Sequence, residues 1–99
     1  MQREFEFGGF EFEWDDDKAA ANVNKHNVPF EEAATIFDDD FLVTIADLDH
    51  SEGEDRYACI GISRQGHLLK VIYVERGRKF RIISARRPTS EEKHDYEYE

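Results

Sequence analysis

The sequence predicts an α+β fold with an antiparallel sheet of four to six strands, two N-terminal helices and one C-terminal helix. Four segments rich in β-branched and aromatic residues follow one another between residues 41 and 87, and short turns join the last three, which is typical of antiparallel sheets. Helical patterns stand before and after these segments. At this length we expect a single domain over residues 1–99, with residues 1–9 as an N-terminal extension or a hairpin arm.

The N-terminal segment reads EFEFGGFEFEW, two alternating runs around a Gly-Gly pair. A two-residue turn at this pair would place Phe7 opposite Phe10 and Phe5 opposite Phe12, with all four rings on one face of a hairpin. Alternatively, only the second run forms a strand, and the residues before it pair loosely or contact a partner.

Two helices are expected next. Asp15 is suited to cap a helix that ends near Lys25, and Asn27 is suited to follow it because asparagine tolerates the left-handed conformation. A second helix is expected to start near Pro29 and to cover Phe30–Phe37, where apolar residues at helical spacing predict a buried stripe.

The remaining elements are strands and a last helix. The strands are expected at residues 41–45, 56–63, 69–74 and 80–85, and residues 46–55 form a polar surface loop. The last two strands form a hairpin around Gly77, and we expect both to be central in the sheet. A capping-box pattern, TSEE at residues 89–92, predicts a helix from about Ser90 towards Tyr96.

Composition excludes several classes of protein. Aromatic residues make up 13% of the chain, which argues against disorder although 36% of the residues are charged. Cys59 is the single cysteine and lies within an apolar strand, so we expect a small buried residue and no internal disulfide. The sequence shows neither a signal segment nor a membrane span, and we expect a cytoplasmic protein with no membrane partner.

Positive charge is concentrated around the predicted central hairpin. Residues 64–87 contain eight basic residues and one acid, Glu75, although the formal net charge of the whole chain is −10. This asymmetry indicates a localised anion site on an acidic protein.

Three segments of the chain resemble a known family in their order and spacing. They read FEWDDDKAAANVNKHNVPFEEAATIF, DHSEGEDRYACIGIS and GHLLKVIYVERGRKFRIISARRPTSEEKHDYE, and they extend from Phe12 to about Glu97. Together they resemble the BrnT family of toxins of type II toxin–antitoxin systems. The chain departs from the family pattern at Asn27, where glycine is usual, at Pro29, where a capping serine is usual, and in the residues before Phe10.

The resemblance implies a RelE-like fold and a ribonuclease that cuts RNA without a metal or other cofactor and thereby inhibits translation. It also implies neutralisation by a BrnA-like antitoxin that carries a DNA-binding domain, in a hetero-oligomer with the toxin. Operator DNA would then be a partner only through the antitoxin. None of these properties follows from composition or periodicity.

Metal-free RNA cleavage requires removal of a proton from the ribose 2′-hydroxyl, stabilisation of charge on the phosphoryl oxygens and assistance to the leaving 5′-oxygen. Arginine suits the second task because its planar fork donates two hydrogen bonds to a phosphate. The catalytic candidates are Lys25, His26, Arg56, Glu75, Arg76, Arg81 and Arg86, and the candidates for RNA binding alone are Arg64, Arg78, Lys79 and Arg87.

Each candidate has an alternative interpretation. On an unbulged strand, Arg81, Ile83 and Ala85 share one face while Phe80, Ile82 and Ser84 share the other, so Arg81 is either a phosphate ligand or a plain surface arginine. Glu75 is either a base or an ion-pair partner of Arg76. Lys25 can act as a base, and His26 can act in either direction or simply pack against backbone carbonyls at the end of its helix.

Two alternatives to a metal-free enzyme are considered: a metal-dependent nuclease that uses the acidic residues, and a module without catalytic activity. The acidic residues Asp38–Asp40, with Asp47, Asp49 and His50, lack a regular ligand spacing, so we predict no metal site. A non-catalytic module that binds nucleic acid or a protein partner through the basic hairpin is the alternative to an enzyme.

Overall fold

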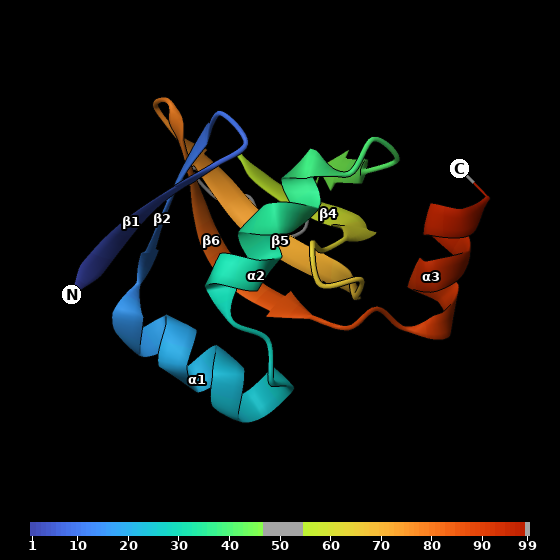
Figure 1. Ribbon diagram of the computed structural model, residues 1–99, viewed down its shortest axis with the longest axis horizontal. Helices are drawn as coiled ribbons and strands as arrows, with labels where there is room; N and C mark the ends of the chain where they lie inside the picture. Colours follow the sequence, from blue (N-terminus) through green and yellow to red (C-terminus); the bar gives the residue numbers. More distant parts are fainter. Residues whose placement is uncertain (47–54, 99) are drawn as a thin grey trace.

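The computed structural model describes residues 1–46 and 55–98 and is organised around the predicted central hairpin (Figure 1). Strands β5 (Leu68–Arg76) and β6 (Lys79–Arg86) flank a turn in which Gly77 has a φ of 61°, a left-handed value that favours glycine. The six-stranded sheet has the order β1-β2-β6-β5-β4-β3, so the prediction that the hairpin is central is confirmed.

The other elements are β1 (Gln2–Phe7), β2 (Phe10–Asp15), α1 (Asp16–His26), α2 (Phe30–Ala34), the 3-10 helix η1 (Thr35–Asp38), β3 (Val43–Ala46), β4 (Arg56–Ile62) and α3 (Ser90–Glu97). In Figure 1, α2 lies in front of the sheet and α1 lies below it, whereas α3 stands apart from them near the C-terminus. Most of the predicted loop over residues 46–55 lies outside the described residues.

Two parts of the predicted architecture are wrong. Strand β2 pairs with β6 in parallel, so the sheet is mixed and not purely antiparallel. Tight turns impose antiparallel pairing only on consecutive strands, and α1, α2, η1 and β3–β5 separate β2 from β6 along the chain. The first two helices are also not N-terminal, because they follow the β1–β2 hairpin and occupy the middle of the element order.

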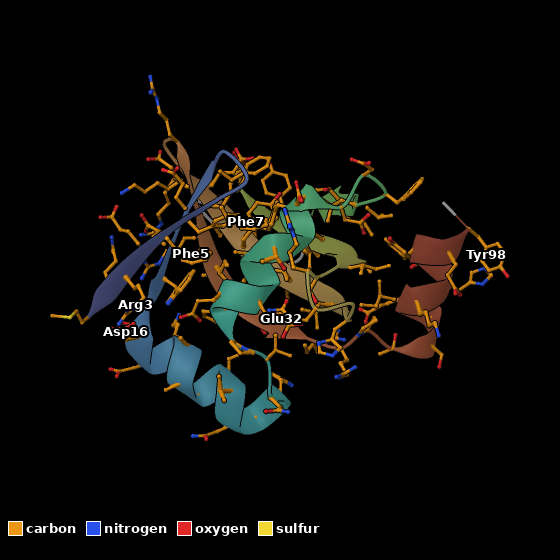
Figure 2. The ribbon with its side chains drawn as sticks, in the orientation of Figure 1. Arg3, Phe5, Phe7, Asp16, Glu32 and Tyr98 are labelled. Carbon is orange, nitrogen blue, oxygen red and sulfur yellow. The ribbon has the colours of Figure 1, made fainter. Side chains whose placement is uncertain are left out.

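The N-terminal hairpin has the predicted register. Phe7 lies opposite Phe10 and Phe5 opposite Phe12. The rings of Phe5, Phe7 and Phe12 join the core, and the more exposed ring of Phe10 packs against Phe12 and Phe80. Figure 2 shows Phe5 and Phe7 on the side of β1 that faces the helices, and Arg3 beside Asp16 at the start of α1, where its Nε donates to the carboxylate at 3.0 Å. The hairpin therefore belongs to the sheet and is also tied to α1.

Local capping signals fix the helix ends. The Asp15 carboxylate accepts a hydrogen bond from the Lys18 amide at the start of α1, and Asn27 follows α1 with φ 58° and ψ 35°, both as predicted. Thr89 and Glu92 form the predicted capping box of α3. The second helix is shorter than predicted, because the α-helix ends at Ala34 and continues as η1.

The core lies between the sheet and the helices α1 and α2. Its largest fully buried side chains are Phe12, Trp14, Phe30, Ile36, Leu69, Val71, Cys59 and Ile82. Cys59 is buried as predicted, and this burial raises the pKa of its thiol although Thr44 bonds to it. The opposite face of the sheet, which we call the open face, is covered only in part, by α3. None of the described helices is long and apolar enough to cross a membrane.

Candidate functional site

Strand β6 contains a β-bulge that decides which of its side chains reach the open face. Ser84 lies opposite Ile72 on β5, whereas Ile82 lies opposite Tyr73, so Ile83 is an extra residue without a direct partner on β5. A bulge of this kind interrupts the regular alternation of side chains along a strand.

The bulge brings Arg81, Ser84 and Arg86 to the same face. Ala85 instead joins Ile82 in the core, and both are almost fully buried. The prediction that groups Arg81 with Ala85, and Ser84 with Ile82, is conditional on an unbulged strand, and the bulge removes that condition. The open face of β6 is consequently more basic than alternation alone predicts.

Arg81 and Arg56 lie in one row across the open face. Glu13 on β2 is the neighbour of Arg81, Val74 on β5 lies on the other side of Arg81, and Arg56 on β4 follows Val74. Val74 is buried between the two arginines. Since neighbouring strands are about 5 Å apart, the backbones at Arg81 and Arg56 are about 10 Å apart, with an apolar floor between them.

The guanidinium of Arg81 is held from one side. Its Nη1 donates to Glu13 Oε2 at 2.8 Å and to Gln2 Oε1 at 3.2 Å. The side chains of Arg81 and Glu13 are only 18% and 9% exposed, so water screens this ion pair little. Within residues 1–46 and 55–98, Nε and Nη2 of Arg81 make no hydrogen bond, and this edge of the guanidinium is the one that can fork onto a phosphate.

The turn end of the β5–β6 hairpin carries further positive charge. Arg76 lies opposite Lys79 on the open face, and Lys79 forms an ion pair with Glu4 of β1. Arg78 is exposed in the turn itself. These side chains extend the basic surface beyond Arg81, although acids of the N-terminal hairpin neutralise part of it.

Arg86 is engaged more completely than Arg81. Its Nη1 and Nη2 donate to the two carboxylate oxygens of Glu92 on α3 at 2.8 and 3.0 Å, and Lys70 Nζ reaches the same carboxylate at 2.6 Å. The hydrogen bond from Arg86, with those from Lys70 and the Thr89 amide, holds the pKa of Glu92 far below its usual range, although burial opposes the shift. Arg86 shares the face of Arg81, but its terminal nitrogens hold α3 in place.

Lys25 and His26, two of the catalytic candidates, lie beside β6. With Ile83 and Ser84 they line a shallow hollow of about 210 Å³ at the last turn of α1. The hollow lies between Arg81 and Arg86 along the strand. Lys25 is exposed and His26 is half-buried, so both are accessible to a ligand on β6.

Glu75 does not join the arginines of the open face. Alternation along β5 turns it away from Arg76 and towards the stacked rings of Tyr57 and Tyr73, whose centroids are 5.5 Å apart. Burial raises the pKa of both tyrosines, and the nearby charge of Glu75 raises each pKa further. The structure therefore separates this candidate base from Arg81.

Two of the RNA-binding candidates lie away from the row of Arg81. Arg64, in the turn between β4 and β5, bonds to Asp38 at 3.1 Å and stacks over the ring of Phe7, on the side of the helices. Arg87 is exposed beyond the end of β6. Neither residue is brought to the centre of the open face.

Two acidic residues at the end of η1, Asp38 and Asp39, have structural partners. Asp38 binds Arg64, and Asp39 accepts hydrogen bonds from the amides of Phe41 and Ile62 and from the Tyr96 hydroxyl. Burial and the Asp39 carboxylate raise the pKa of Tyr96 to about 12. The described parts of the chain contain no cluster of three metal-ligating side chains, and Asp47, Asp49 and His50 lie outside them.

Sequence reasoning missed three residues that organise the site. Glu13 and Glu92 hold the two arginines, and Asn22 holds the edge of β6 through a pair of hydrogen bonds with the Ala85 backbone. The alternation of the N-terminal run could have shown that Glu13 lies on the face opposite to Phe12 and Trp14, which is the open face. The sequence marks Glu92 only as part of a helix cap. Glu13 and Asn22 are more than 60 residues from their partners on β6, and Glu92, although only six residues from Arg86, lies on another element, so no local pattern marks these contacts.

The arrangement is suited to binding a polyanion on a flat surface. It offers one guanidinium with a free forked edge, further cations on both sides and two titratable groups beside the strand. Comparison with known protein families matches residues 14–92 to the family described as "Ribonuclease toxin, BrnT, of type II toxin-antitoxin system". This match confirms the resemblance seen in the sequence. A comparison with curated proteins finds no match.

Proposed function

This chain belongs to the BrnT family of ribonuclease toxins of type II toxin–antitoxin systems, and from that premise we propose that it is a metal-independent endoribonuclease whose site is the open face around Arg81. The single observation that carries the proposal is the Arg81 guanidinium, which is anchored through Nη1 while its Nε–Nη2 edge has no partner among the described residues. Such an edge can donate two parallel hydrogen bonds to a phosphate.

In the proposed reaction, the ribose 2′-hydroxyl loses its proton and its oxygen attacks the adjacent phosphorus. The bond from phosphorus to the 5′-oxygen breaks, which leaves a 2′,3′-cyclic phosphate, and the departing 5′-oxygen takes up a proton to become a hydroxyl. Arg81 stabilises the extra charge on the phosphoryl oxygens, and Arg56 supports it from the far side of Val74. We assign the two proton transfers to Lys25 and His26, which lie beside Ser84.

Other basic residues have smaller parts in this proposal. Arg76, Arg78 and Lys79 attract the RNA backbone beyond the scissile phosphate, and Arg87 does so at the other end of β6. Arg86 becomes a phosphate ligand only when Glu92 releases it. Arg64 contributes only through the general field of the protein, and Glu75 takes no part in the proton transfers, since both lie away from the row of Arg81.

The proposed biology follows the family. We propose a RelE-like fold, cleavage of RNA in the cytoplasm that inhibits translation, and neutralisation by a BrnA-like antitoxin. In this proposal the antitoxin supplies the DNA-binding domain, so the toxin reaches operator DNA only within their complex. The type II classification supports a protein antitoxin in general.

The test is induced expression of the wild type and Arg81→Ala, followed by RNA cleavage with the purified proteins in the presence and absence of EDTA. We expect growth arrest and EDTA-resistant cleavage by the wild type, and a cleavage rate about 100-fold lower for Arg81→Ala, as for loss of one oxyanion donor. Lys93→Ala is the matched control, because it removes one exposed positive charge from α3.

Three outcomes would contradict parts of this proposal. Loss of cleavage in EDTA would contradict metal independence. Equal loss in Arg81→Ala and Lys93→Ala would show that net charge matters and the site does not. RNA binding without cleavage by the folded wild type would favour a non-catalytic binding module.

A further inference from the structure

The N-terminal hairpin supplies the only hydrogen bonds that the side chain of Arg81 makes within the described residues. Both partners, Glu13 and Gln2, lie outside the segment that matches the family, which begins at Trp14. Glu13 is 7% exposed, so it is too enclosed to reach an RNA hydroxyl itself. Its carboxylate must act through the residue that it contacts.

The two acceptors constrain how the guanidinium lies. Both hydrogen bonds leave from Nη1, which has two hydrogens, so this nitrogen is fully used. The group is planar, and fixing Nη1 at two acceptors therefore fixes the direction of the Nε–Nη2 edge. Rotation about the side-chain torsions would break a charge-assisted hydrogen bond in a poorly hydrated setting.

Arg86 provides an internal comparison. Glu92 engages Nη1 and Nη2 of Arg86 together, which leaves no complete fork at the terminal nitrogens for a phosphate. Glu13 engages only one nitrogen of Arg81 and leaves a fork intact. A glutamate thus occupies the fork of Arg86, whereas at Arg81 a glutamate orients a fork that stays available to a ligand.

We propose that Glu13 is a positioning residue for the RNA-cleavage site, which fixes the guanidinium of Arg81 so that its Nε–Nη2 edge meets the scissile phosphate. Gln2 assists as the second acceptor on Nη1. This inference rests on the proposed ribonuclease function. It adds that the first strands of the chain are part of the catalytic apparatus, although neither acceptor touches RNA.

The test compares Glu13→Ala, Glu13→Gln and Arg81→Ala with the double variant Glu13→Ala/Arg81→Ala in steady-state cleavage of a short RNA. Glu13→Ala should lower kcat about tenfold or more, while KM changes less than about threefold, because misplacement of a reacting group affects the transition state most. Glu13→Gln keeps an acceptor oxygen and should retain part of the rate. In the Arg81→Ala background, removal of Glu13 should have no further effect.

Glu6→Ala is the matched control. Glu6 is an exposed glutamate of the same hairpin and lies on the same face as Glu4, but it makes none of the contacts with Arg81. This variant removes the same charge and should cleave RNA like the wild type. Urea unfolding of every variant gives the folded fraction, to which each rate is normalised.

The outcomes separate the alternatives. Faster cleavage or tighter RNA binding in Glu13→Ala would mean that Glu13 competes with phosphate, and the proposal would be overturned. A lower free energy of unfolding with unchanged kcat would show a purely structural ion pair. Additive losses in the double variant would mean that Glu13 does not act through Arg81.

A second measurement keeps this inference separate from the proposed function. The Nε–H resonance of Arg81 is followed by NMR while a 2′-deoxy oligonucleotide, which cannot be cleaved by this route, is added. A shift in the wild type that is lost in Glu13→Ala supports positioning even if the wild type cuts no RNA. No shift in the folded wild type would overturn the inference, whatever the fate of the ribonuclease proposal.

Discussion

At the scale of single residues, the function of a charged side chain depends on which of its atoms are already engaged. Arg81 and Arg86 lie on one strand and one face, but Glu13 uses one nitrogen of the first and Glu92 uses two of the second. The sequence predicts that both arginines are on β6 and that the region is basic. It cannot predict their carboxylate partners, because each lies on another element and charge alone does not select among 23 acids.

Asn22 is the clearest case of a buried polar residue with a structural task. Its side-chain amide donates to the carbonyls of Val28 and Ala85 at 2.9 and 2.8 Å, and its oxygen accepts from the Ala85 amide at 3.1 Å. It thereby completes the edge of β6 beyond the end of β2. Asn22, which the sequence marks only as a residue of a helix, therefore takes the place of a neighbouring strand at the edge of β6.

We expect Asn22→Ala to lower the free energy of unfolding by about 2 kcal/mol, because it leaves buried backbone groups without partners. Urea unfolding at neutral pH measures this change. Asn24→Ala, at an exposed position of the same helix, should change stability by less than about 0.5 kcal/mol. Equal effects of the two substitutions would mean that the contacts with β6 contribute nothing.

At the scale of elements, contacts between residues that are close in sequence are predicted, and contacts between distant segments are not. The helix caps at Asp15, Asn27 and Thr89 and both hairpins follow from short patterns, and all are confirmed. The parallel contact of β2 with β6 joins distant segments, and so does the ion pair between Lys70 on β5 and Glu92 on α3, so no short pattern encodes them. The site is assembled mainly from these non-local contacts.

Helix α3 is joined to the sheet through Glu92, and this makes its attachment sensitive to acid. Since the pKa of Glu92 is lower in the folded protein than its ordinary value of 4.5, its contribution to stability is complete above pH 4.5. The contribution is lost as the pH falls from 4.5 towards the folded value. Protonation removes the charge that Arg86 and Lys70 share.

We expect Glu92→Gln to lower the free energy of unfolding at pH 7 by about 1–2 kcal/mol while glutamine preserves the helix cap. The difference from the wild type should shrink as the pH is lowered from 5 to 3, which urea unfolding at several pH values measures. Glu91→Gln, at an exposed position of the same helix, is the control. A difference that stays constant over this range would contradict the assigned role.

At the scale of the whole molecule, a basic face is set on a protein with a formal net charge of −10. In the proposed function, the net charge repels RNA at long range and Arg81 attracts it at short range. Added salt weakens the two interactions to different extents, because they act over different distances. The Debye length is about 8 Å at physiological ionic strength, so repulsion by the distant acids is screened first. The sequence predicts the charge asymmetry, but only the fold shows that acids of both chain ends border the basic face.

We expect the association rate with a non-cleavable RNA analogue to rise as salt increases from about 20 to 150 mM, because screening reduces the repulsion between like-charged molecules. The dissociation rate should rise as well, since the phosphate contacts weaken. Stopped-flow fluorescence measures both rates. An association rate that falls steeply over this range would show that steering by the basic face outweighs the net charge.

The bulge residue Ile83 also determines how β6 would respond to the deletion of a residue. Arg81 and Arg86 are an odd number of positions apart, so a regular strand would point them in opposite directions, and Ile83 absorbs the difference. Deletion of Ile83 should leave every neighbouring side chain on its present side while it draws the two cations closer together. The bulge therefore sets the interval between the two guanidinium groups on the open face.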